Sequence, residues 1–86
     1  MEHAVQRVDG VAFEDLGEAG TVLVNRRHSY RVGLIEHRTG SHRRFIELRL
    51  LDAGQPTRWA FRIDPNAVTE LCALLERGRR MAHEVP

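Results

Sequence analysis

A strand runs into a helix within residues 57–65, which read Thr-Arg-Trp-Ala-Phe-Arg-Ile-Asp-Pro. Large apolar residues occupy every second position from Trp59 to Ile63, a spacing that is typical of a β-strand with one buried face. Asp64 is a favoured residue at a helix N-cap, and Pro65 is favoured at the first helical position after it. The segment therefore predicts a strand that ends at Ile63 and a helix that begins directly afterwards.

The residues that follow have helical spacing. Gly78 is a natural helix end because glycine readily adopts the conformation found just past a helix C-terminus. We therefore expect the helix to end there and residues 79–86 to form a frayed tail. The apolar positions lie at i, i+3, i+4 and i+7, with two neighbours that widen the stripe: Val68, Leu71, Cys72 and Leu75, then Ala67 and Leu74.

Three more strands are predicted upstream of residue 57. The first is a β-branched run over residues 21–27, and alternating side chains predict two others over residues 29–37 and 42–51. Glycine in the turn at 38–41, and glycine with proline in the turn at 52–56, separate these strands. Short connections favour an antiparallel meander. The predicted fold class is α+β, a four-stranded antiparallel sheet followed by one C-terminal helix (ββββα).

The chain length allows one domain, since 86 residues bury only one small core. We divide it into an acidic N-terminal arm at residues 1–20, a ββββα domain at residues 21–78 and a C-terminal tail at residues 79–86. The arm contains apolar residues and three glycines, so a short strand, a docked arm and a loose tail all remain open. We expect a partly ordered segment.

The charge is unevenly distributed along the chain. The net charge of +1 combines −4 in residues 1–20, +6 in residues 21–62 and −1 in residues 63–86. All thirteen basic residues are arginine, which fits a codon bias and also fits phosphate binding by guanidinium groups. A basic middle of this density indicates an anionic partner. We expect the acidic arm to compete with that partner for the basic residues.

The strands are expected to present two different faces. The helix should cover the face that we call the apolar face, which carries Val32, Leu34, Ile46, Leu48, Trp59 and Phe61. The opposite face should be open, and we call it the arginine face; it carries Arg31, Arg43, Phe45, Arg49, Arg58 and Arg62, with Glu47 as its one acid.

Arginines around a phenylalanine suit a single nucleic-acid strand, because cations contact phosphates and an aromatic ring stacks on a base. Phe45 favours this interpretation, since a merely solvated face does not need a phenyl ring. Two alternatives remain. Antiparallel sheets often carry charges on an ordinary solvated face, and the arginines could instead meet an acidic protein partner in an interaction or assembly module.

Three segments of the chain resemble one repeat of the Pur-alpha proteins: residues 26–32 (RRHSYRV), 36–40 (EHRTG) and 45–48 (FIEL). The strand-to-helix entry described above is similar as well, and the likeness covers about residues 21–78. In that family each repeat has four antiparallel strands and a helix, and the whirly proteins and the positive-cofactor coactivators have related architecture.

This resemblance implies binding of single-stranded DNA or RNA on the sheet and the pairing of two repeats, which for one repeat means a homodimer. A marginal core and uncovered sheet edges also favour a homodimer. The chain departs from the family pattern because it has no lysine and has an acidic N-terminal arm. By position, the resemblance maps the contacts to Arg27, Arg31, Arg43, Phe45 and Arg49.

Other motifs carry less information. Arg27 and Arg31 have the R-x-x-x-R spacing of the cyclic-dinucleotide-binding PilZ domains, but the D-x-S-x-x-G partner motif is missing. His37 and His42 flank a hairpin without an obvious third ligand, so no metal site is predicted. Ser29 has a neighbouring histidine in the sequence, yet no acid or oxyanion loop accompanies it. We therefore expect no enzyme activity and no cofactor.

The sequence also bears on location. Cys72 is the only cysteine, so nothing requires an oxidising compartment, and we expect this thiol to be buried on the apolar helix face. The chain has no apolar run near the ~18 residues that span a bilayer and no basic-then-apolar signal peptide. We expect a cytoplasmic homodimer, without a membrane role, that binds single-stranded nucleic acid through Arg27 and the arginine face.

Overall fold

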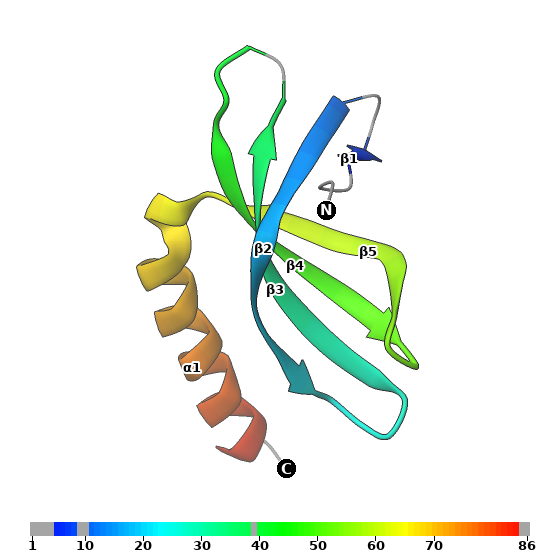
Figure 1. The fold of residues 1–86 in the computed structure, drawn as a ribbon. Helices are drawn as coiled ribbons and strands as arrows, with labels where there is room; N and C mark the ends of the chain where they lie inside the picture. Colours follow the sequence, from blue (N-terminus) through cyan, green and yellow to red (C-terminus); the bar gives the residue numbers. More distant parts are fainter. Residues whose placement is uncertain (1–4, 9–10, 39, 85–86) are drawn as a thin grey trace.

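In the computed structural model of the protein, the described residues are 5–8, 11–38 and 40–84. These residues form one antiparallel sheet with the strand order β1-β2-β3-β4-β5, followed by a single C-terminal helix (Figure 1). The predicted α+β class, an antiparallel meander with one helix after it, is confirmed. The elements are β1 (Val5–Val8), β2 (Val11–Leu23), β3 (His28–His37), β4 (Arg44–Asp52), β5 (Gln55–Ile63), the 3-10 turn η1 (Pro65–Ala67) and α1 (Val68–Glu84).

The strand β2 begins ten residues earlier than the sequence predicts and ends at Leu23 rather than at residue 27, so the expected boundary after residue 20 lies inside it. The strand β1 pairs with residues 11–14 of β2. Two register shifts in the β2–β3 pairing, between Asp15 and Gly17 and between Glu18 and Gly20, account for the difference at the start of β2. Gly17 has a φ of 138°, a backbone conformation that favours glycine. Such bulges interrupt the alternation of side chains. The sequence of this part of β2 therefore lacks the period of two that predicts a strand.

The start of the helix is as predicted, and its end is not. The Asp64 side chain accepts a hydrogen bond from the Asn66 amide, and Pro65 opens the first turn. The helix continues through Gly78 to Glu84, although we expected a stop at that glycine. A glycine inside a helix costs only about 1 kcal/mol relative to alanine, so six further residues outweigh it.

The helix leaves the apolar face exposed, contrary to our expectation. Trp59 and Phe61 on β5 are 67% and 66% exposed. All α1 side chains are exposed except Val68 and Leu71, which are half-buried, and Cys72 is exposed rather than buried. Figure 1 shows α1 running from the end of β5 along one side of the sheet.

The core lies instead on the arginine face. Phe13 on β2 has its ring centroid 6.3 Å from that of Phe45 on β4, and Arg62 on β5 stands 4.7 Å over the Phe13 ring. Since β2 and β5 are not neighbouring strands, the sheet must curl around this face to bring them together. The expectation that this face is open is therefore wrong at its centre. Among the residues whose burial is described, the buried apolar and charged side chains lie on this face: Phe13, Ile35, Glu47, Arg49 and Leu51.

Candidate nucleic-acid interface

The centre of the arginine face is a buried ion pair. Arg49 donates from Nε to Glu47 Oε1 at 2.9 Å and from Nη2 to Glu47 Oε2 at 3.0 Å. The two residues are 8% and 3% exposed. Arg49 also donates to the Thr57 carbonyl on β5, so its guanidinium links two strands. This arginine neutralises Glu47 and supports the sheet, and its exposure leaves almost no surface for a phosphate.

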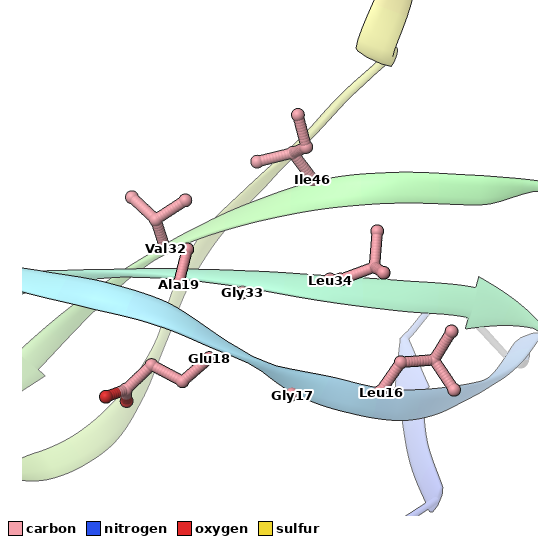
Figure 2. Close-up of a pocket in the computed structure, with 8 residues that line it drawn as sticks. All are labelled: Leu16, Gly17, Glu18, Ala19, Val32, Gly33, Leu34 and Ile46. Carbon is pink, nitrogen blue, oxygen red and sulfur yellow. The ribbon is translucent and has the colours of Figure 1, made fainter.

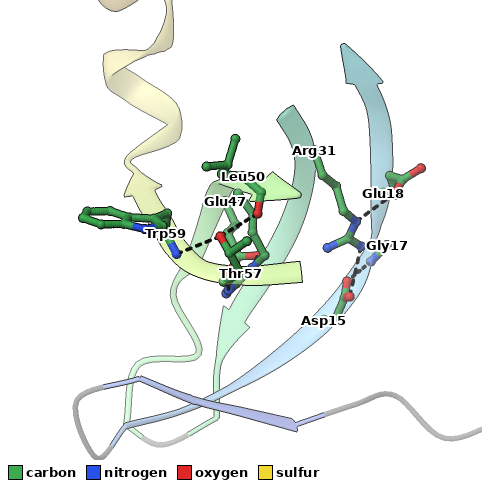
Figure 3. A network of polar contacts seen from close by, with 9 residues as sticks. Asp15, Gly17, Glu18, Arg31, Glu47, Leu50, Thr57 and Trp59 are labelled. Carbon is green, nitrogen blue, oxygen red and sulfur yellow. Dashed lines mark hydrogen bonds and ion pairs between the residues drawn. The ribbon is translucent and has the colours of Figure 1, made fainter. Parts of the chain in front are cut away.

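Arg31 is held in a similar way by β2. Its Nε donates to Glu18 Oε1 at 2.8 Å and its Nη2 to Asp15 Oδ2 at 3.1 Å (Figure 3). Burial lowers the pKa of Arg31, but the hydrogen bonds to the two carboxylates outweigh burial and raise the pKa above its ordinary value. The Arg31 side chain is 17% exposed. Two acidic residues therefore surround one arginine that the sequence predicts to face solvent.

These acidic contacts were missed as site residues, although the sequence contained a signal for them. The −4 charge of residues 1–20 lies next to the +6 segment, and we expected the two to interact. The interaction is made within the sheet, because Asp15 and Glu18 are β2 residues. Glu14 on the same strand pairs with Arg38. The acidic residues from 14 onward are thus part of the fold rather than of a separable arm.

The hairpin end of the arginine face carries Arg43 and Phe45. The Arg43 guanidinium lies 5.0 Å from the centroid of the Phe45 ring and pairs with Asp64 at the start of the helix. The Phe45 ring also packs edge-to-face against the ring of Phe13. Phe45 is half-buried, so this ring holds an arginine and packs in the core, whereas we expected an exposed stacking platform. The Arg43 side chain remains 58% exposed.

The remaining predicted residues lie at the margin of the sheet. Arg58 and Arg62 are exposed residues of β5, the edge strand opposite β1. Within the described ranges, Arg58 has no ion pair, whereas Arg62 contacts Phe13. Arg27 is 70% exposed and pairs with Asp52, and its carbonyl accepts from the Ala53 amide in the turn before β5. The hydrogen bond to Asp52 raises the pKa of Arg27.

The structure thus divides the seven predicted residues into two groups. The first group is committed to the interior: Arg31, Phe45 and Arg49. The second group surrounds β5, with Arg27 near the turn that precedes it, Arg43 near its end and two exposed arginines along it: Arg27, Arg43, Arg58 and Arg62.

Two shallow hollows mark the apolar face. One, of about 210 Å³, is lined by Tyr30, Trp59, Phe61 and two leucines. The other, of about 360 Å³, lies over β2, β3 and β4. Figure 2 shows its apolar side chains pointing to one side of the sheet, while Glu18 points away. Its apolar side chains are Leu16, Ala19, Val32, Leu34 and Ile46.

Neither a metal site nor a membrane span is found within the described ranges. No three histidine, cysteine or acidic residues come together there as ligands, and His37 instead stacks edge-on against Phe13 with centroids 5.2 Å apart. In the same part of the chain, α1 is too short and too polar to cross a bilayer.

Comparison of the chain with protein-family models, with curated proteins and with solved structures finds no match in any of the three.

Proposed function

We propose that this chain binds single-stranded nucleic acid along β5, the edge strand of the arginine face. The observation that carries the proposal is the exposed row of guanidinium groups around that strand. Arg58 and Arg62 are both exposed and lie four residues apart on β5, with Arg58 in the stretch where the pairing of β5 with β4 shifts register. Arg43 extends the row at the end of β5, and Arg27 extends it at the turn before the strand.

The chemistry of this row favours a phosphate polymer over a single small anion. Guanidinium groups bind phosphate oxygens through two parallel hydrogen bonds, and they also stack on bases. Sites for single strands combine a positively charged groove along the backbone with aromatic side chains that stack on bases, and along β5 the guanidinium planes would serve as the stacking groups. The buried arginines contribute to the shape of the face and not to its contacts.

The proposal predicts a steep dependence of affinity on salt. For single strands, the slope of log K against log salt concentration is about −0.7 for each neutralised phosphate. Four contacts give a slope of about −2.8, which means a loss of roughly 50-fold between 50 and 200 mM salt. Replacing Arg58 and Arg62 by alanine should reduce the slope to about −1.4 and the loss to roughly 7-fold.

Fluorescence anisotropy with labelled single-stranded DNA and RNA oligonucleotides measures both quantities. The matched control is the double variant Arg77→Ala with Arg80→Ala, which removes two exposed positive charges from α1. This control should keep the wild-type slope. A wild-type chain without affinity for any single strand at 50 mM salt overturns the proposal and favours the acidic protein partner. Equal effects of the two double variants would overturn the assignment to β5.

A further inference from the structure

Among the described residues, no element covers a large apolar surface of this chain. On the sheet, Trp59 and Phe61 are two-thirds exposed and Tyr30 is 44% exposed. On the helix, Leu74 and Leu75 are 57% and 64% exposed. A helix that covers a sheet normally buries its apolar stripe against that sheet. Here the two complementary surfaces occur in the same chain and do not cover each other.

The total accessible surface of the chain is larger than that expected of a compact monomer of the same mass. The chain has 6942 Å² of accessible surface, whereas a folded monomer of 9.9 kDa is expected to have about 5200 Å². Its radius of gyration is 14.8 Å, compared with about 12 Å for a compact domain of this length. The excess area is about 1700 Å². This excess is comparable with the roughly 1600 Å² that a standard protein–protein interface buries in total.

We propose that a second copy of this chain covers the apolar face, and that each copy places α1 on the sheet of the other. The exchange is reciprocal, so one pair of surfaces closes the assembly with twofold symmetry. The inference goes beyond the homodimer expected from the sequence because it names the two surfaces that meet. It is independent of the proposed nucleic-acid site, which lies along β5 and the arginine face.

The dimensions of the two surfaces match. The 17 residues of α1 span about 26 Å, and the nine or ten residues of β3, β4 and β5 span about 30 Å. The hollows of about 360 and 210 Å³ on the apolar face can receive helix side chains. A second copy fits better than an unrelated partner, because this chain itself supplies a helix that lacks a sheet and a sheet that lacks a helix.

The single tryptophan of the chain makes the proposal directly measurable. Trp59 is 67% exposed in one copy, but the α1 helix of a second copy would bury it. We expect sedimentation to show a dimer at tens of micromolar and the emission of Trp59 to be blue-shifted relative to free tryptophan. Dilution should shift the emission to the red over the same concentration range in which the dimer dissociates.

A charged residue in the helix stripe should break the assembly. Leu75→Glu removes an apolar side chain twice per dimer, so self-association should weaken by about 100-fold or more. The matched control, Ala73→Glu, adds the same carboxylate to the opposite side of α1 and should leave the dimer intact. Circular dichroism at each concentration reports whether the variants keep their strands and helix, and the wild-type dilution series needs no variant.

Three results overturn the proposal. One is a monomer with a buried Trp59, which would mean that α1 folds onto its own sheet. Another is a monomer at tens of micromolar with solvent-exposed Trp59. The third is a dimer in which Trp59 stays exposed, which would mean that the copies pair elsewhere, for example along the β5 edge.

Discussion

Replacing Glu47 by alanine should leave the guanidinium of Arg49 buried without its counter-charge. The pair is joined by two hydrogen bonds of 2.9 and 3.0 Å, and both residues are less than a tenth exposed. Two unit charges about 4 Å apart interact by about 4 kcal/mol at an effective dielectric constant of about 20. Measured losses for breaking one side of a buried pair are about 3–5 kcal/mol, which agrees with this value.

Urea unfolding followed by circular dichroism, at one fixed protein concentration, measures the effect. With a slope of about 1 kcal/mol per molar urea for a small domain, the Glu47→Ala midpoint should fall by roughly 3 M or more. The control is Glu76→Ala, which breaks the pair with Arg79 on α1, whose side chains are 51% and 60% exposed. Exposed pairs contribute about 0–1 kcal/mol, so the control midpoint should change little.

The double variant Glu47→Leu with Arg49→Met separates the cost of an orphaned charge from the contribution of the pair. Apolar replacement of both partners in a buried pair is often neutral or stabilising. We therefore expect the double variant to be within about 1 kcal/mol of the wild-type chain. A Glu47→Ala midpoint as close to wild type as that of the control would refute the assignment of this pair to the core.

Two further predictions concern a helix cap and a close backbone approach. The hydrogen bond from the Asn66 amide lowers the pKa of Asp64, so its stabilisation is present above the unfolded pKa of about 3.9 and is lost as pH falls through the folded value. Asp64→Asn should keep the cap and reduce the loss of stability between pH 4 and pH 2 in acid titrations followed by circular dichroism. A Cβ on Gly33 would lie 3.1 Å from the carbonyl oxygen of Gly17, so Gly33→Ala should destabilise by about 1 kcal/mol or more, measured by thermal unfolding. Gly20→Ala meets no atom within 4 Å and should be neutral or slightly stabilising; equal effects of the two alanines would contradict the close approach.

The later strands and the helix start were predictable because their signals are local. Alternation and turn glycines gave β3, β4 and β5 to within two residues of their ends. Asp64 and Pro65 marked the helix start because capping depends on neighbouring backbone atoms. The first half of β2 was not predictable in this way. Its pairing with β3 includes two bulges, and these break the period of two on which the sequence argument relies.

The candidate site was predicted only in part, because the sequence did not show which face of the sheet is the interior. Alternation assigns side chains to two faces, but it does not say which face becomes the interior. Hydrophobicity indicated the apolar face, whereas the curl of the sheet encloses the opposite one. Arg31 and Arg49 become interior residues there because three carboxylates reach them, and two of these, Asp15 and Glu18, lie in the part of β2 that the sequence did not reveal.

If a second copy covers the apolar face, dimer formation explains why one chain alone buries charged residues and exposes apolar ones. The arginine face is then the interior of one chain, and the apolar face is the interior of the pair. Because a chain this small buries little surface alone, its folding would be coupled to association and its stability would rise with protein concentration. Arg62, whose guanidinium stands over the Phe13 ring, keeps its side chain on the face that the second copy does not cover. Nucleic acid would therefore bind a dimer at two separate rows of arginines, one on each copy, and the two proposals can fail independently.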